Sequence, residues 1–198
     1  MKQTVFRWIG VLSVVVTAAI ASACASDAPI APDAATASPK GMLSVANVSN
    51  GNRLPDLTGC EKLSAPAGST LVFSALGVGV QIYRWSGTSW VFVSPLATLY
   101  ADAGGHGQVA SHFVGPTWQS NSGGKVVGTV AERCTHDASS IPWLSLTGVA
   151  SGPGIFAKVT FIQRLNTVGG NAPSTPGSVV GAEVQVPYTA DYLFYKAP

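Results

Sequence analysis

The sequence predicts one all-β domain from Asn52 to Pro198, built as a single sandwich or barrel. Short runs rich in Val, Ile, Phe, Tyr and Trp recur about every ten residues, and Gly, Pro and Ser separate them. No long stretch spaces its apolar residues with the 3.6-residue period of a helix, and no internal repeat of fixed period is present. A domain of about 140 residues is long enough to bury one core.

The first strands follow directly from these runs. Leu71–Leu76 is apolar and strand-like, Gly77-Val78-Gly79 is expected to bend the chain, and Val80–Trp85 continues in extended form. Ser86–Ser89 then predicts a hairpin connection into Trp90–Val93. Six further strands are expected, each set off by a turn signal: Gln108–Val114, Lys125–Ala131, Trp143–Val149, Ile155–Leu165, Val179–Val186 and Tyr188–Lys196.

Two of the expected strands carry polar residues among apolar ones. Gln81 lies within Val80–Trp85, and Gln163 and Arg164 lie on opposite faces of Ile155–Leu165. Such a residue is either a hydrogen-bonded group inside the core or part of a pocket wall, because a buried polar group without a partner is costly.

Residues 1–23 have the features of a secretory signal peptide. Lys2 and Arg7 give a positive start, and the apolar run Trp8–Ile20 is too short to span a membrane as a helix. Ala21-Ser22-Ala23-Cys24 resembles a bacterial lipobox, in which the cysteine is diacylated and becomes the mature N-terminus. The alternative is cleavage by ordinary signal peptidase, which would release a soluble protein starting at Cys24.

Residues 24–51 are expected to form the lipid-attachment cysteine and a disordered tether. They are rich in Ala, Ser, Pro and Asp, and contain little that could build a core. Ala25 is not the aspartate that retains many lipoproteins at the inner membrane. We therefore expect a cell-envelope protein, anchored to the outer membrane through its N-terminal lipid in a host with two membranes. A secreted or periplasmic soluble protein is the alternative.

Charge excludes one class of partner. The chain has 11 Lys and Arg against 9 Asp and Glu, and cleavage before Cys24 removes Lys2 and Arg7 but no acidic residue. The mature chain is then neutral, so we expect no nucleic acid among its partners.

Cys60 and Cys134 remain as an even pair once Cys24 is assigned to the lipid. In an oxidising compartment they are expected to form a disulfide, the alternative being two unpaired thiols. No C-x-x-C or Cys/His cluster indicates zinc.

Five ordered blocks of the chain stand out: Leu71–Trp85 (LVFSALGVGVQIYRW), His112–Trp118 (HFVGPTW), Ile141–Leu144 (IPWL), Phe161–Gly170 (FIQRLNTVGG) and Pro187–Tyr195 (PYTADYLFY). They resemble the landmarks of an uncharacterised family, domain of unknown function 3455, which occurs in bacteria and fungi. The resemblance covers about Asn52 to Lys196, so it implies one intact domain, and it brings no catalytic residues with it.

Metal and cofactor sites are not expected. His106 and His112 would lie roughly 20 Å apart on one continuous strand, and neither they nor His136 have metal-ligand spacing. Gly77-Val78-Gly79 has Ile82 in place of a third glycine and precedes a strand, which argues against a dinucleotide site.

Catalytic residues are hard to assemble because no G-x-S-x-G motif is present. The least arbitrary set uses His112 as a base oriented by Asp191 or Asp102, with Arg164 binding an anionic group. Ordinary structural roles compete with it: Arg164 would cap carbonyls of the next loop, and Asp191 would stabilise a turn.

Aromatic recognition is the strongest functional interpretation, because the domain is rich in large rings that either fill the core or bind sugars and peptides. Trp118 lies between Gly115-Pro116 and a polar segment, so it is expected in a loop and exposed. The rings are Tyr83, Trp85, Trp90, Trp118, Trp143, Tyr188 and Tyr192.

The sequence therefore predicts a non-catalytic envelope module that binds a glycan, a peptide or a small ligand. A hydrolase acting on an envelope or extracellular substrate is the alternative. The residues predicted to line its pocket are Gln81, Tyr83, His112, Trp118, Arg164 and Asp191.

Overall fold

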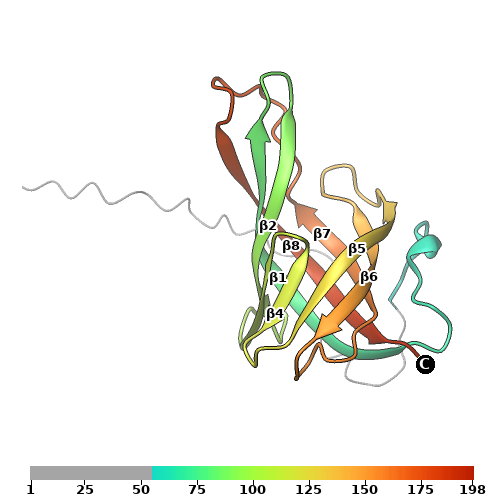
Figure 1. Cartoon of the computed structure of the whole chain (residues 1–198). Helices are drawn as coiled ribbons and strands as arrows, with labels where there is room; N and C mark the ends of the chain where they lie inside the picture. Colours follow the sequence, from blue (N-terminus) through green and yellow to red (C-terminus); the bar gives the residue numbers. More distant parts are fainter. Residues whose placement is uncertain (1–54) are drawn as a thin grey trace, which may run out of the picture. The chain divides into compact units, whose positions relative to one another are not determined.

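Eight strands form one closed ring in the computed structural model, which describes residues 55–198 (Figure 1). Each strand is antiparallel to its neighbours in the chain, and the last strand pairs with the first. The all-β prediction is confirmed, and its sandwich and barrel alternatives resolve to a barrel. The strands are β1 (Thr70–Trp85), β2 (Trp90–Tyr100), β3 (Gln108–Phe113), β4 (Thr117–Ser120), β5 (Lys125–Cys134), β6 (Trp143–Ser151), β7 (Phe161–Gly169) and β8 (Glu183–Lys196).

The described residues begin after the predicted signal peptide, the Cys24 lipid site and the tether, so these predictions lie outside them. Helical structure in residues 55–198 is limited to the 3-10 turn η1 (Glu61–Leu63). No helix in this range is long and apolar enough to cross a membrane.

β1 is one continuous strand, so the bend predicted at Gly77-Val78-Gly79 is wrong. The glycines provide space instead. A Cβ atom on Gly77 would lie 2.5 Å from Cε2 of Tyr192, whose ring fills the barrel interior beside it. The expected strand Val179–Val186 is also corrected, because β8 starts at Glu183 and continues through Pro187 to Lys196.

One end of the barrel is closed by the connection between β6 and β7. The sequence predicted a strand over Ile155–Leu165, but β7 starts only at Phe161. The preceding loop inserts Phe156 and Val159, which are fully buried, into the core. The ring centroid of Phe156 lies 4.8 Å from that of Phe194 on β8. The apolar residues that suggested a strand therefore act as a plug.

At the opposite end, β1, β2 and the start of β8 extend beyond the other strands as a three-stranded arm (Figure 1). Pairing between β1 and β2 continues to Trp85 and Trp90, whose ring centroids are 5.4 Å apart. The Nε1 of Trp90 donates a hydrogen bond to the carbonyl oxygen of Thr175, which ties the loop before β8 to this arm.

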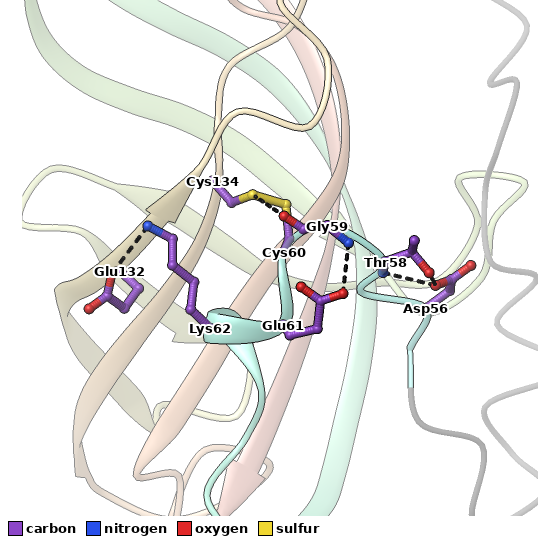
Figure 2. Close-up of a disulfide and its surroundings, with 8 residues drawn as sticks. All are labelled: Asp56, Thr58, Gly59, Cys60, Glu61, Lys62, Glu132 and Cys134. Carbon is purple, nitrogen blue, oxygen red and sulfur yellow. Dashed lines mark hydrogen bonds and ion pairs between the residues drawn. A yellow bond between two sulfur atoms is a disulfide. The ribbon is translucent and has the colours of Figure 1, made fainter.

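The segment before β1 covers the outside of β6, β7 and β8 and is held there by the predicted disulfide, which is confirmed (Figure 2). The Cα atoms of Cys60 and Cys134 are 5.7 Å apart, within the usual range for a disulfide. Gln163 lies beneath this segment, where its Nε2 donates to the carbonyl oxygen of Leu63 and its Oε1 accepts from the hydroxyl of Tyr195. Of the two alternatives for Gln163, the structure shows a hydrogen-bonded core group.

Candidate functional site

A cavity of about 380 Å³ occupies the end of the barrel opposite the Phe156 plug. All eight strands contribute to its wall, because this is the end where odd-numbered strands finish and even-numbered strands begin. Eight-stranded barrels enclose just enough space for side chains or one small ligand. Here the plugged half holds side chains, and the other half leaves a space in the size range of small-molecule sites.

Five of the six residues predicted for a pocket line this cavity, and they come from four strands, β1, β3, β4 and β7. Their side chains meet because each points into the barrel from near the same end. They are Gln81, Tyr83, His112, Trp118 and Arg164.

Asp191 does not line the cavity. It lies between Ala190 and Tyr192 on β8, and both of these residues belong to the core inside the barrel. Alternation along the strand places Asp191 on the outer face. There its carboxylate accepts a hydrogen bond from Nδ2 of Asn166 at 2.9 Å. Asp191 therefore cannot orient His112.

Trp118 is not exposed in a loop, as its flanking residues suggested. It lies in β4 and is 1% exposed. Its ring stacks on that of His112 with centroids 4.3 Å apart and planes 7° from parallel. Tyr192 packs edge-on against both rings. The stacked pair makes a rigid part of the cavity wall.

His112 is neutral in this environment. Burial, together with a smaller effect of the positive charge of Arg164, lowers the pKa of its imidazole to about 3. Its Nδ1 lies 2.9 Å from the carbonyl oxygen of Thr117. Since a carbonyl can only accept, Nδ1 carries the proton and Nε2 keeps a lone pair.

Arg164 shares the inner face of β7 with Ile162. Its Nη2 donates to the carbonyl oxygen of Pro142 at 2.7 Å, which holds the guanidinium at the cavity wall. The sequence suggested that Arg164 caps carbonyls of the next loop, whereas this carbonyl belongs to the connection between β5 and β6. The Nε atom of Arg164 is buried and has no acceptor among the described residues.

Two further donors at the cavity share this property. Nε2 of Gln81 and Nε1 of Trp118 are buried, and no described residue accepts a hydrogen bond from either. Burial raises the pKa of the Tyr188 phenol, and the nearby side chain of Gln81 offsets part of this rise. Each unpaired buried donor costs about 1–3 kcal/mol, more when it belongs to a charged group. Three of them around one cavity are unusual in a folded protein.

The phenols near the cavity are satisfied and protonated. The hydroxyl of Tyr83 donates to the carbonyl oxygen of Gly170 at 2.7 Å, and the hydroxyls of Tyr188 and Tyr192 lie 3.0 Å apart. Burial raises the pKa of Tyr83, and it also raises the pKa of Tyr192. They add no negative charge at neutral pH.

Arg133 also lines the cavity, and sequence analysis did not identify it. Strict alternation from Val126 and Val130 would turn Glu132 inward. An irregularity in the pairing of β5 with β6 occurs between Val130 and Glu132, and it shifts the alternation by one residue. Arg133 therefore faces the rim of the cavity, where it stays exposed, while Glu132 lies outside and forms an ion pair with Lys62 at 3.5 Å (Figure 2).

The rest of the wall is mostly apolar. Sequence analysis did not identify these residues, because many of them are prolines or lie in loops. The main apolar lining residues are Phe92, Pro95, Pro116, Pro142, Leu144 and Leu146.

The catalytic set considered from the sequence does not assemble. Asp102 lies in the connection between β2 and β3, at the plugged end, where its Oδ1 contacts Nδ1 of His106 at 3.3 Å. His136 stacks on Trp143 with ring centroids 4.0 Å apart. Within residues 55–198 no three His, Cys, Asp or Glu side chains gather as a metal site would require.

A family model described as "Protein of unknown function (DUF3455)" matches residues 66–196, more than half of the chain. The chain therefore belongs to this family, and the resemblance seen in the sequence is confirmed. No curated protein and no solved structure matches the chain.

Proposed function

We propose that this member of the DUF3455 family is a binding module that holds one small molecule in the open end of its barrel. The observation that carries the proposal is the set of three buried donors without acceptors, on Gln81, Trp118 and Arg164, around one cavity. A ligand with acceptor atoms would complete their hydrogen bonds and stabilise the folded protein.

Among the ligand classes expected from the sequence, the cavity favours a small molecule. Its volume of about 380 Å³ is enclosed by strands, whereas glycan chains and peptides are usually held in open grooves or along exposed aromatic rings. Trp118 and Trp143 are 1% and 5% exposed, so neither offers a free ring face to solvent.

Binding is preferred to hydrolysis because of the state of His112. A general base works best when its pKa lies near the operating pH, and burial lowers the pKa of His112 to about 3. Its Nδ1 contacts a backbone carbonyl, where a catalytic base would contact a carboxylate.

The module is proposed to act in the cell envelope after export. The signal-like residues 1–23 and the lipobox-like sequence ending in Cys24 support this location. The disulfide between Cys60 and Cys134 adds support, because such bonds persist in oxidising compartments. Lipid on Cys24 would attach the protein to a membrane, in a two-membrane host the outer one. Mass spectrometry of the mature N-terminus tests this, and an unmodified Cys24 would leave a secreted or periplasmic soluble protein.

The cavity is tested with N-phenyl-1-naphthylamine, a neutral fluorescent probe that brightens in apolar surroundings. We expect the folded protein to enhance its fluorescence saturably. Val130→Trp should abolish the enhancement because Val130 lines the cavity. Val127→Trp is the matched control, since Val127 is on the same strand but is 38% exposed on the outer face. Equal enhancement by wild type and Val130→Trp, with both variants folded, would overturn the proposal.

A further inference from the structure

We infer that the ligand is a small organic anion, with a carboxylate or similar oxyanion bound at Arg164 and a compact apolar body against the rest of the wall. This inference rests on the proposed binding function and specifies the chemical class of its ligand. It follows from three features of the cavity: its charge, its hydrogen-bonding capacity and the apolar character of its wall.

The charge of the cavity is positive. Arg164 and Arg133 line it, and no Asp or Glu is among the described residues that do. His112 is neutral and the Tyr83 and Tyr192 phenols are protonated, so nothing in the wall offsets the two guanidinium groups. Two acidic side chains on the strands, Glu132 and Asp191, face away from the cavity: Glu132 pairs with Lys62 outside the barrel, and Asp191 bonds to Asn166.

The irregularity in β5 determines the sign of the charge at the cavity. If β5 alternated without it, Glu132 would occupy the position at the cavity that Arg133 now holds, opposite Leu144 of β6. One carboxylate and one guanidinium would then face each other across the wall. The irregularity converts a site with balanced charges into one with two positive charges.

The hydrogen-bonding capacity of the cavity is one-sided. The three unpaired buried side-chain atoms around it are all N–H donors, on Gln81, Trp118 and Arg164. Arg164 is the charged member, and a guanidinium binds carboxylates with particular strength because its donors are fixed in one plane. A ligand rich in acceptors fits these atoms, and a ligand rich in donors does not.

The wall also selects the body of the ligand. The stacked rings of His112 and Trp118 are 2% and 1% exposed and make the wall rigid, while Phe92 and Pro116, which are less buried, supply apolar area. A compact apolar group would remove this surface from water, while its oxyanion would meet the guanidinium.

The test compares two probes of nearly equal shape, 2-naphthoate and its neutral amide, 2-naphthamide, as competitors of N-phenyl-1-naphthylamine on the folded, disulfide-bonded protein. We expect naphthoate to displace the dye at a concentration at least tenfold below that of naphthamide. Dye binding with equal displacement by both competitors would overturn the anion inference and leave the binding function standing. Absence of dye binding would overturn the binding function first.

Arg164→Met then tests the residue, because methionine keeps the apolar stem and removes the charge. We expect this variant to weaken naphthoate at least tenfold and to change naphthamide less than threefold. Naphthamide also reports whether the cavity survives loss of the hydrogen bond to Pro142. Arg133→Gln, at the rim, should weaken naphthoate by a few-fold. Arg84→Met is the control, since Arg84 pairs with Glu183 on the arm at 2.7 Å. Unchanged naphthoate binding in Arg164→Met would refute the assignment.

Discussion

Replacing Phe156 with alanine should remove the plug that closes one end of the barrel. Phe156 is 0% exposed. Its ring packs on Phe194 with centroids 4.8 Å apart and edge-on against Phe73 at 6.3 Å. Burial of such a ring and its aromatic contacts makes the whole side chain contribute to the free energy of unfolding.

The expected cost is about 4 kcal/mol. Phe→Ala changes in cores cost about 3–5 kcal/mol, and the value is lower where the structure can collapse into the space. Collapse is restricted here because hydrogen bonds hold the loop backbone in place: Val159 donates its N–H to the carbonyl of Phe156, and Thr160 donates to that of Tyr195. A loss of this size is a large part of the 5–15 kcal/mol typical of a folded domain.

Urea unfolding of the oxidised protein, followed by tryptophan fluorescence, measures this loss. Ile155→Ala is the matched control in the same loop, because Ile155 is 36% exposed and its truncation should cost about 1 kcal/mol or less. If Phe156→Ala cost no more than Ile155→Ala, the loop would not be part of the core and the closed end would be misassigned.

Three further changes test other parts of the fold. The double variant Cys60→Ala/Cys134→Ala should lower the free energy of unfolding by about 4 kcal/mol, since the disulfide spans 74 residues; a loss under about 1 kcal/mol in urea titrations would contradict this. The pKa of His112 is lowered to about 3, so the unfolded chain binds a proton between about pH 3 and 6.5 that the folded chain does not, and stability falls as pH is lowered through this window. Between pH 7 and 4.5 the free energy of unfolding of His112→Gln should therefore fall by about 2–3 kcal/mol less than that of wild type. Equal falls in the two proteins would refute a neutral buried His112. Gly77→Ala should destabilise by about 1–3 kcal/mol because its Cβ would overlap the Tyr192 ring, and a thermal midpoint equal to that of wild type would show that this ring has room to move.

Much of the site was predictable because polar residues stand out in a strand that faces inward. Gln81 and Arg164 each interrupt an apolar run, and both line the cavity. Gln163 interrupts the same run as Arg164, yet it faces outward beneath Leu63. Alternation told the two faces of β7 apart, but it could not tell which face was inside, because the segment before β1 buries the outer face as well.

The same covering explains the error at Asp191. Along β8, Tyr192 and Phe194 face the interior while Leu193 and Tyr195 face the covering segment, so both faces are apolar and give no sign of direction. Glu132 and Arg133 were beyond prediction for another reason. Their directions depend on an irregularity in strand pairing, and adjacent residues of opposite charge do not reveal which one the irregularity turns inward.

The barrel closes only when β8, the last strand, pairs with β1, so folding cannot be completed without the C-terminal end of the chain. Thr70 lies opposite Lys196, and the pairing continues to Arg84 opposite Glu183. Contacts this distant in sequence form late and slow the search for the native state. Until β8 arrives, β1 and β7 are both unpaired edges that can join strands of other chains. A protein truncated before β8 would therefore keep β1 and β7 as exposed edges. We expect it to aggregate through these two edges, so that its solubility would fall before its stability could be measured.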